Sequence, residues 1–142
     1  MSEVLTTSIM LLCLEDHKNN PDIIGCWTAN KTPDGVRKML ANPSAKMFVA
    51  LRDDRIAAVG STLGNEIGLN YVHPAYRFVG ASKALLEAME NELRERGITI
   101  ATLTSTATAH RFYLAAGWED AGPPEASFMT LGYPMHKALQ RL

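Results

Sequence analysis

Two groups of residues in this 142-residue chain have the types and spacing to do chemistry. The first is YRFVGASKALL, residues 76–86, in which Arg77 and Gly80 stand just before a predicted helix. The first amides of a helix lack intrahelical partners and carry the positive end of the helix dipole, so they bind anions. Gly80 leaves room for close backbone approach, and Lys83 adds charge. The stretch predicts an anion site, although taken alone an ordinary loop with a capping glycine is the commoner explanation.

The second group is TAHRFYLAAGW, residues 108–118, which holds Tyr113 on a helix predicted directly after the next strand. By itself, an aromatic residue beside Phe112 and Leu114 is usually a core residue. The N-termini of both helices should, however, lie at the same end of a sheet, where ligands of α/β proteins bind. The two groups together therefore favour a shared site over two unrelated features.

Several other kinds of site are disfavoured by the motifs. The dinucleotide fingerprint GxGxxG, the phosphate loop GxxxxGK[ST] and the nucleophile motif GxSxG do not occur. The four histidines and two cysteines show no metal-ligand spacing, so we expect no metal. We expect His17 and His136 to be surface residues, whereas His73 and His110 stay candidates for acid–base work.

The elements that would position these groups follow from the apolar pattern. Two apolar runs separated by Asp53-Asp54 predict a hairpin, with strands at 46–52 and 55–63, and a third strand is expected at 66–72. A long amphipathic helix then runs to Gly97, its natural C-terminal cap. A β-branched strand at 98–106, a second helix and a last strand near 127–136 complete the pattern.

The N-terminal third is predicted to be helical. Residues 4–14 form an apolar run that favours a helix, and Thr32-Pro33 is typical of a helix start. Without repeats, linkers or low-complexity segments, residues 1–142 are expected to form one domain. The order of elements predicts an α/β (α+β) fold with a mixed, mostly antiparallel sheet flanked by helices.

Composition narrows the class of protein. The chain is 46% apolar and 20% charged, with 14 basic and 15 acidic residues and a formal charge of -1. It has no positive excess that would attract nucleic acid or an anionic membrane. Cys13 and Cys26 cannot form a disulfide framework, no apolar run is long enough to span a membrane, and the N-terminus lacks a signal-peptide pattern. We expect a soluble, cytoplasmic protein.

At these residues the chain resembles the GCN5-related N-acetyltransferases (GNAT). EIGLNYVHPAYRFVGASKALL (66–86) resembles the strand, acetyl-CoA loop and helix of the family's R/Q-x-x-G-x-G/A motif. TATAHRFYLAAGW (106–118) resembles its A-x-x-x-Y-x-x-x-G-F segment, and MFVALRDDRIAAVG (47–60) the preceding hairpin. The resemblance implies a sheet splayed between its central strands, with acetyl-CoA as co-substrate and no metal.

The resemblance also implies roles for individual residues. Tyr113 would protonate the departing thiolate, and Glu66 would deprotonate the amine, with a strand residue facing solvent as the alternative for Glu66. The residues implied to bind the cofactor are Asn70, Tyr71, Val72, Arg77, Phe78, Val79, Gly80, Ala81, Ser82, Lys83 and Tyr113. A backbone amide near Tyr71 or Val72 would stabilise the oxyanion.

Some positions depart from the family pattern. Ser82 replaces the usual second glycine or alanine, Phe78 replaces a frequent glycine, and Thr106 stands where asparagine is common. If residues 4–14 are helical, the strand with which the family usually opens is missing or reduced.

The implied function is transfer of an acetyl group from acetyl-CoA to a primary amine by direct attack on the thioester. A non-catalytic acyl-CoA-binding or regulatory module of the same fold, or an interaction domain without coenzyme A, are the alternatives. The acceptor, a small molecule or a peptide, is not readable from the sequence. Glu15, Asp16 and Asp34 would attract a cationic amine, but a solvated helix face explains them equally well. A homodimer is expected by analogy only.

Overall fold

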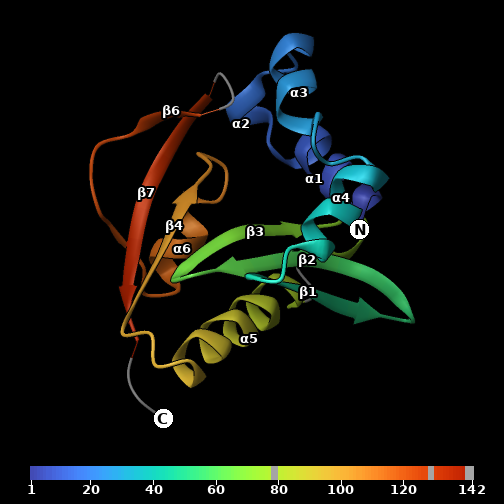
Figure 1. Cartoon of the computed structure of the whole chain (residues 1–142). Helices are drawn as coiled ribbons and strands as arrows, with labels where there is room; N and C mark the ends of the chain where they lie inside the picture. Colours follow the sequence, from blue (N-terminus) through green and yellow to red (C-terminus); the bar gives the residue numbers. More distant parts are fainter. Residues whose placement is uncertain (78–79, 128–129, 140–142) are drawn as a thin grey trace.

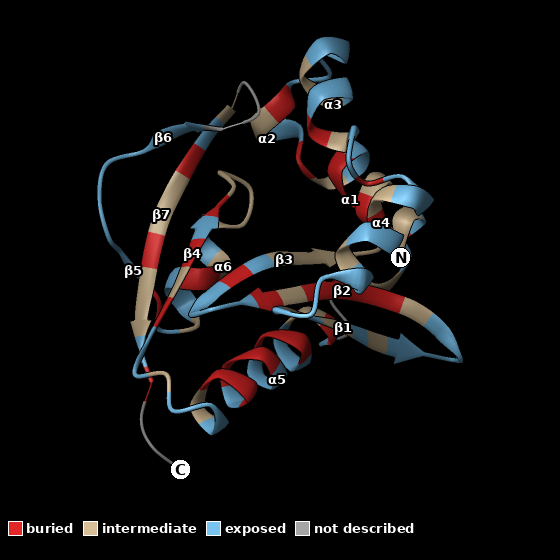
Figure 2. Ribbon diagram, viewed as in Figure 1, coloured by how far each residue is buried: buried red, intermediate tan, exposed pale blue. Residues whose placement is uncertain are grey.

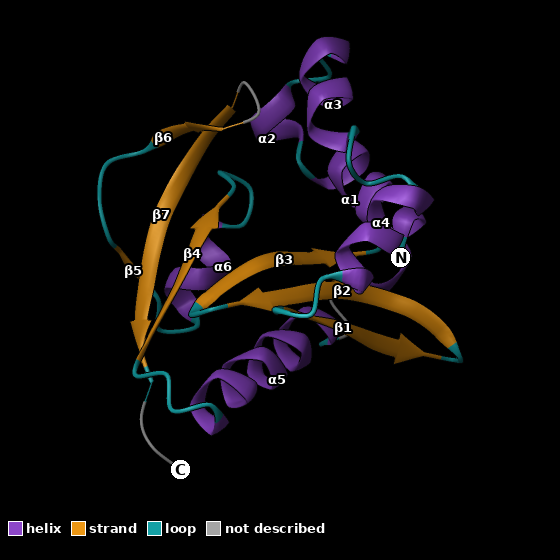
Figure 3. Ribbon diagram, viewed as in Figure 1, coloured by secondary structure: helices purple, strands orange, loops and turns teal. Residues whose placement is uncertain are grey.

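The computed structural model describes residues 1–77, 80–127 and 130–139. Its centre is a mixed sheet with strand order β1-β2-β3-β4-β7-β5, in which the short β6 pairs with β7 outside this path. Helices pack on both faces of the sheet (Figure 1; Figure 3). All neighbouring strands are antiparallel except β3 and β4. The predicted α/β fold with a mixed, mostly antiparallel sheet is therefore confirmed.

Strands β1 (Ala45–Arg52) and β2 (Arg55–Leu63) form the predicted hairpin. The two turn residues, Asp53 and Asp54, both have positive φ angles, 52° and 61°. Such backbone angles match the right-handed twist of a two-residue hairpin turn, and aspartate tolerates them. Strand β3 (Glu66–Val72) pairs with β2, so the first three strands form an antiparallel meander.

A bulge in β3 separates the sheet into two halves. Ser61 of β2 pairs with Leu69 and Thr62 with Ile67, which leaves Gly68 as the extra residue. Such a bulge bends a strand and increases its twist.

The parallel pairing of β3 with β4 (Ile100–Ser105) is correspondingly short. It is limited to Glu66–Thr102 and Ile67–Leu103. Beyond these two pairs β3 and β4 diverge, and in Figure 1 the two groups of strands run in different directions from the start of β3.

The second half of the sheet is built on β7 (Thr130–Ala138), whose residues 133–138 pair with β4. It also carries β5 (Glu119–Asp120) and β6 (Glu125–Ser127). The last strand was expected only from near residue 127, so both short strands were missed. Glu119, Asp120 and Glu125 are exposed and charged, so neither segment shows the alternation of apolar side chains that marks a strand.

Helix α5 (Ala81–Glu95) covers one face of β1, β2 and β3. Its buried stripe, which faces the sheet in Figure 2, includes Leu85, Leu86, Met89 and Leu93, as expected for an amphipathic helix. Gly60 on β2 lets the helix approach closely, since a Cβ there would lie 2.6 Å from the Met89 sulfur. Gly97, at φ 81°, follows the helix, and Ile98 N–H donates to the Leu93 carbonyl, as expected for a glycine cap.

The opposite face carries α1 (Ser2–Leu12), α3 (Pro21–Thr28) and α4 (Pro33–Ala41), with the one-turn α2 (Leu14–His17) beside them. The Thr32 hydroxyl accepts from Gly35 N–H, so the predicted helix start is confirmed. The run at 4–14 is helical from residue 2 to residue 12, and no strand precedes it in the described residues. No helix among these residues is long and apolar enough to cross a membrane.

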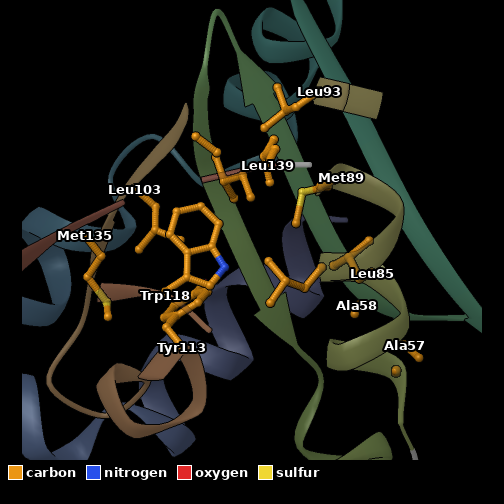
Figure 4. Packing of buried hydrophobic residues seen from close by; sticks show 14 residues of the cluster. Ala57, Ala58, Leu85, Met89, Leu93, Leu103, Tyr113, Trp118, Met135 and Leu139 are labelled. Atoms are coloured by element: carbon orange, nitrogen blue, oxygen red, sulfur yellow. The ribbon is translucent and has the colours of Figure 1, made fainter. Parts of the chain in front are cut away.

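The larger core lies between α5, α6 (His110–Ala115) and the sheet. Around Trp118 it gathers Leu103 from β4, Met135 from β7 and Tyr113 from α6 (Figure 4). This packing fixes α6 against the second half of the sheet.

Candidate functional site

The divergence of β3 and β4 opens a cavity of about 360 Å³ between the two halves of the sheet. Residues 67–72 of β3 form one wall, and residues 103–106 at the end of β4 form the other. Side chains of α1 and α6 and the start of α5 complete the lining. We call this cavity the cleft.

Tyr113 reaches the cleft from the second turn of α6. Its side chain is buried, and its ring packs edge-on against Trp118 with the centroids 6.1 Å apart. Asn70 Nδ2 donates a hydrogen bond to the phenol oxygen at 3.0 Å. Burial raises the pKa of Tyr113 to about 12, although the Asn70 hydrogen bond acts in the opposite direction. Because the oxygen accepts from Asn70, the phenol proton stays available to a group in the cleft.

The end of β3 presents one free edge to the cleft. Residues Asn70, Tyr71 and Val72 pair with β2 on one side, whereas the pairing of β3 with β4 ends at Ile67, three residues before Asn70. An extended ligand can therefore form strand-like hydrogen bonds with this edge.

The mouth of α5 forms the end of the same cleft. Gly80 has φ 84° and directly precedes Ala81, the first residue of the helix. Gly80, Ser82, Lys83 and Arg77 line the cavity, so the departure at Ser82 lies at the site itself. Phe78 and Val79, predicted to contribute to this loop, lie outside the described residues.

Glu66 is not brought to the cleft. It is the first residue of β3, is exposed, and pairs with Leu63 and Thr102 where the two halves of the sheet meet. Tyr113 instead faces Asn70, four residues further along the strand. Glu66 therefore lies outside the cleft lining, because the pairing of β3 with β4 places it at the closed end of the divergence.

The two alternative bases also lie outside the cleft lining. His73 Nδ1 accepts from Ala75 N–H at the start of the short 3₁₀ helix η1 (Pro74–Tyr76). His110 Nε2 lies 2.7 Å from Asp120 Oδ1, and its ring stacks on Tyr133 at 4.8 Å. Both imidazoles are therefore occupied by contacts outside the cleft.

The sequence did not indicate the wall that α1 supplies. Ser8, Leu12 and Cys13 line the cleft opposite α6, and Tyr71 completes this side. Trp27 Nε1 donates to the Tyr71 oxygen at 3.2 Å. Burial and the charge of Asp16 raise the pKa of Cys13 to about 12, so the thiol is protonated and is no nucleophile near neutral pH.

Asp16 joins the two halves of the molecule across the open end of the cleft. Its carboxylate accepts from Ala107 N–H at 2.6 Å, from Thr108 N–H at 3.2 Å and from the Thr108 hydroxyl at 2.6 Å. Asp16 belongs to α2, whereas residues 107 and 108 connect β4 to α6. We call this set of three hydrogen bonds the Asp16 tie. No sequence pattern pointed to it, because the partners are 91 and 92 residues apart.

His17, expected at the surface, is fully buried. Its Nδ1 accepts from Asn19 N–H at 3.0 Å, so Nε2 carries the proton and donates to the Ile9 carbonyl at 2.7 Å. The ring also packs edge-on against Trp27. His17 thereby anchors α2, which carries Asp16, to α1 and α3. The expectation failed because both ring nitrogens find partners close in the sequence, which makes burial of a neutral imidazole inexpensive.

The remaining predicted carboxylates stay outside. Glu15 is exposed on α2, and Asp34 forms an ion pair with Arg37 on the exposed face of α4. In the described residues no group of three or more histidine, cysteine, aspartate or glutamate side chains is placed to hold a metal ion.

These features define an acyltransferase fold with an open cleft, and the family comparison agrees. Residues 15–139 match the model of the acetyltransferase (GNAT) domain. The chain therefore belongs to the GNAT acetyltransferase family and is an enzyme of that class. No curated protein matches the chain in sequence.

Solved structures of acetyltransferases share the fold of this chain. A GCN5-related N-acetyltransferase from Rhodopseudomonas palustris is 20% identical, with a TM-score of 0.85 over 97% of this chain and 87% of that chain. The PaiA N-acetyltransferase from Thermoplasma acidophilum, solved with coenzyme A, is 17% identical, with a TM-score of 0.76 and 96% and 89% coverage. An aminoglycoside 6'-N-acetyltransferase complexed with coenzyme A is 14% identical, with a TM-score of 0.70 and 99% and 92% coverage.

Proposed function

We propose that the protein transfers an acetyl group from acetyl-CoA to a primary amine by direct attack on the thioester. The observation that carries this proposal is the position of the Tyr113 phenol, 3.0 Å from Asn70 Nδ2 at the free edge of β3. From this position Tyr113 would act as an acid beside the edge along which an extended thioester arm would lie. Coenzyme A in two structures of the same fold adds support.

The start of α5 would hold the pyrophosphate of the co-substrate. Amides of the first helical turn point outward without intrahelical acceptors, and the helix dipole favours an anion there. The positive φ of Gly80 turns the chain directly into this helix, while Arg77 and Lys83 line the same end of the cleft. The arm would then extend along residues 70–72 toward Tyr113.

The chemical step needs no covalent enzyme intermediate. A neutral amine nitrogen attacks the thioester carbonyl carbon, and a backbone amide near Tyr71 or Val72 stabilises the oxyanion, an effect typically worth about 3–4 kcal/mol. When the carbon–sulfur bond breaks, Tyr113 gives its proton to the departing thiolate. Holding both reactants in one cleft supplies much of the rate, about 7–11 kcal/mol in well-oriented reactions.

Release of free thiol tests the proposal. We expect acetyl-CoA to bind with a measurable heat in calorimetry, and a panel of primary amines to release coenzyme A thiol together with an acetylated product of the expected mass. Binding of acetyl-CoA without any product would contradict the proposal and favour a non-catalytic acyl-CoA-binding module. Absence of binding would point to an interaction domain.

A further inference from the structure

The lining of the cleft carries no side chain suited to take a proton from an amine. In the described part of the chain, its ionisable residues are Cys13, Tyr71, Tyr113, Arg77 and Lys83. None of the five is a carboxylate or an imidazole. The residues outside the described part are Phe78, Val79, Phe128, Met129, Gln140, Arg141 and Leu142. They contribute no carboxylate or imidazole side chain either.

The three ionisable residues without positive charge keep their protons at neutral pH. Burial raises the pKa of Cys13 and that of Tyr113 to about 12, and it raises the pKa of Tyr71 as well. They come from three different elements, at the α1–α2 junction, on β3 and on α6. Burial thus disfavours the charged forms of these three residues. An ammonium group that enters this part of the cleft would meet the same desolvation penalty.

Asp16 is a carboxylate close to the cleft, since its charge acts on both Cys13 and Tyr71 and it binds Thr108 of the lining. Its two oxygens are already engaged by the three donors of the Asp16 tie. Asp16 is therefore a structural link rather than a proton acceptor.

The remaining candidates are occupied elsewhere. Both nitrogens of His17 are hydrogen bonded, and His73 caps η1. His110 faces Asp120, while His136 lies on β7 with Glu119 3.7 Å away. A cleft without a base requires an amine that arrives without its proton.

We propose that the acceptor is a weakly basic primary amine, such as the α-amine of a peptide, which loses its proton to water before it reaches the thioester. This inference rests on the proposed function. The neutral nitrogen forms the new bond to the acetyl carbon, the carbon–sulfur bond breaks, and the thiolate takes the Tyr113 proton. The surplus proton on the nitrogen leaves to water, and water restores the proton of Tyr113.

Basicity separates this class from alkyl amines. An α-amine has a pKa of about 7.7–8.0 and a lysine ε-amine about 10.4, so at pH 7 the neutral fraction differs by about 400-fold. The neutral lysine amine is more basic and therefore also the stronger nucleophile, which offsets part of this difference. For thiols, the Brønsted coefficient that relates nucleophilicity to basicity is about 0.4–0.5. A net preference of about tenfold or more for the α-amine is therefore expected.

One peptide can compare both amines. A short peptide with a free N-terminus and a single lysine, but no other charged side chain, is incubated with acetyl-CoA at pH 7. Fragmentation mass spectrometry then locates the acetyl group, which we expect on the α-amine in about tenfold excess or more. Matched peptides, one acetylated at its N-terminus and one dimethylated at the lysine, isolate each amine for kinetics.

The pH profile distinguishes an unaided amine from an enzyme base. Between pH 6 and 9.5, kcat/KM for the α-amine peptide should level off near its own pKa of about 8. The value for the ε-amine peptide should keep rising tenfold per pH unit. The Asp16→Asn variant should show the same pH dependence of kcat/KM as the wild type with each peptide, even where its absolute rate is lower.

Three results with these peptides would overturn the acceptor class. They are a common inflection with both peptides, a profile that changes shape in Asp16→Asn, and a preference for the ε-amine at pH 7. Thiol release with an alkyl polyamine alone would overturn the acceptor class but leave the acetyl transfer standing. Release with no amine at all would overturn the proposed function itself.

Discussion

Tyr113 combines two roles that a single substitution can separate. Its ring packs against Trp118 in the core, whereas its hydroxyl faces the cleft and Asn70. Tyr113→Phe keeps the ring and removes the hydroxyl. Because general acid catalysis typically contributes 10²–10⁴-fold and a thiolate is an undemanding leaving group, we expect kcat to fall by about 10²-fold. Steady-state thiol release with a saturating amine measures this loss.

A matched variant distinguishes the loss of the Tyr113 phenol proton from the loss of the hydrogen bond between Tyr113 and Asn70. Asn70→Ala removes the donor to the phenol but leaves the hydroxyl in place, so its kcat should fall about tenfold at most, in line with one hydrogen bond of about 1 kcal/mol. Equal losses in Tyr113→Phe and Asn70→Ala would argue that the hydroxyl only positions Asn70. An unchanged kcat in Tyr113→Phe, with chemistry rate-limiting, would remove its role as acid.

At the scale of the element, the two ends of α5 allow a controlled test of the anion site. Gly80 and Gly97 have nearly equal φ angles, 84° and 81°, and an added Cβ would meet nothing within 4 Å at either position. Gly80→Ala and Gly97→Ala should therefore cost similar backbone strain, about 1–2 kcal/mol of stability each. Only Gly80 lines the cleft.

We expect Gly80→Ala to weaken acetyl-CoA binding by about tenfold or more in calorimetry, because the new methyl group occupies the surface on which the pyrophosphate would rest. Gly97→Ala should bind acetyl-CoA as the wild type does. Equal affinities in the two variants, with equal losses of stability, would contradict an anion site at the mouth of α5.

The Asp16 tie is a second feature that links whole secondary-structure elements. It connects the helices on the first half of the sheet to the loop before α6, in addition to the two paired positions that join β3 to β4. Asp16→Asn replaces an accepting oxygen by a donor and should cost about 1.5–3 kcal/mol of unfolding free energy, the usual value of a charged hydrogen bond. It should also weaken acetyl-CoA binding, since the width of the cleft is no longer fixed.

Thr108→Val provides the partner for a double-mutant cycle. It removes the hydroxyl that donates to Asp16, and the double variant should lose less than the sum of the two single losses in urea unfolding. Asp22→Asn, an exposed change on α3, should lie within about 0.5 kcal/mol of the wild type. Additive losses at Asp16 and Thr108 would show that the tie contributes nothing as a unit.

For the whole molecule, the strands and helices that depend on a local residue pattern could be predicted from the sequence. The three strands from 46 to 72 and the helix that ends before Gly97 follow from apolar alternation, turn residues and glycine caps. The edge strands β5 and β6 lack such a pattern. The Asp16 tie and the burial of His17 depend on contacts that only the assembled fold creates, and the position of Glu66 depends on where a bulge ends the pairing of two strands.

The low polarity of the cleft also predicts how the stability of the whole molecule changes with pH. Burial raises the pKa of Tyr113 from about 10 in the unfolded chain to about 12 in the folded protein. A raised pKa means that the folded protein holds the proton more tightly. Its contribution to stability is complete below pH 10 and is lost as the pH rises toward 12. In this window one such group changes the unfolding free energy by about 1.4 kcal/mol per pH unit.

Urea unfolding of the wild type at pH 9, 10.5 and 11.5 should therefore show a stability that falls with pH, and Tyr71 and Cys13 should add to the same trend because burial raises their pKa values too. Tyr113→Phe is the diagnostic variant. It lacks the ionisable phenol, so its decline between pH 10.5 and 11.5 should be shallower than that of the wild type by about 1 kcal/mol per unit. Parallel declines in the two proteins would mean that the Tyr113 phenol is solvated, and the low polarity that we assign to the part of the cleft around Cys13, Tyr71 and Tyr113 would then be wrong.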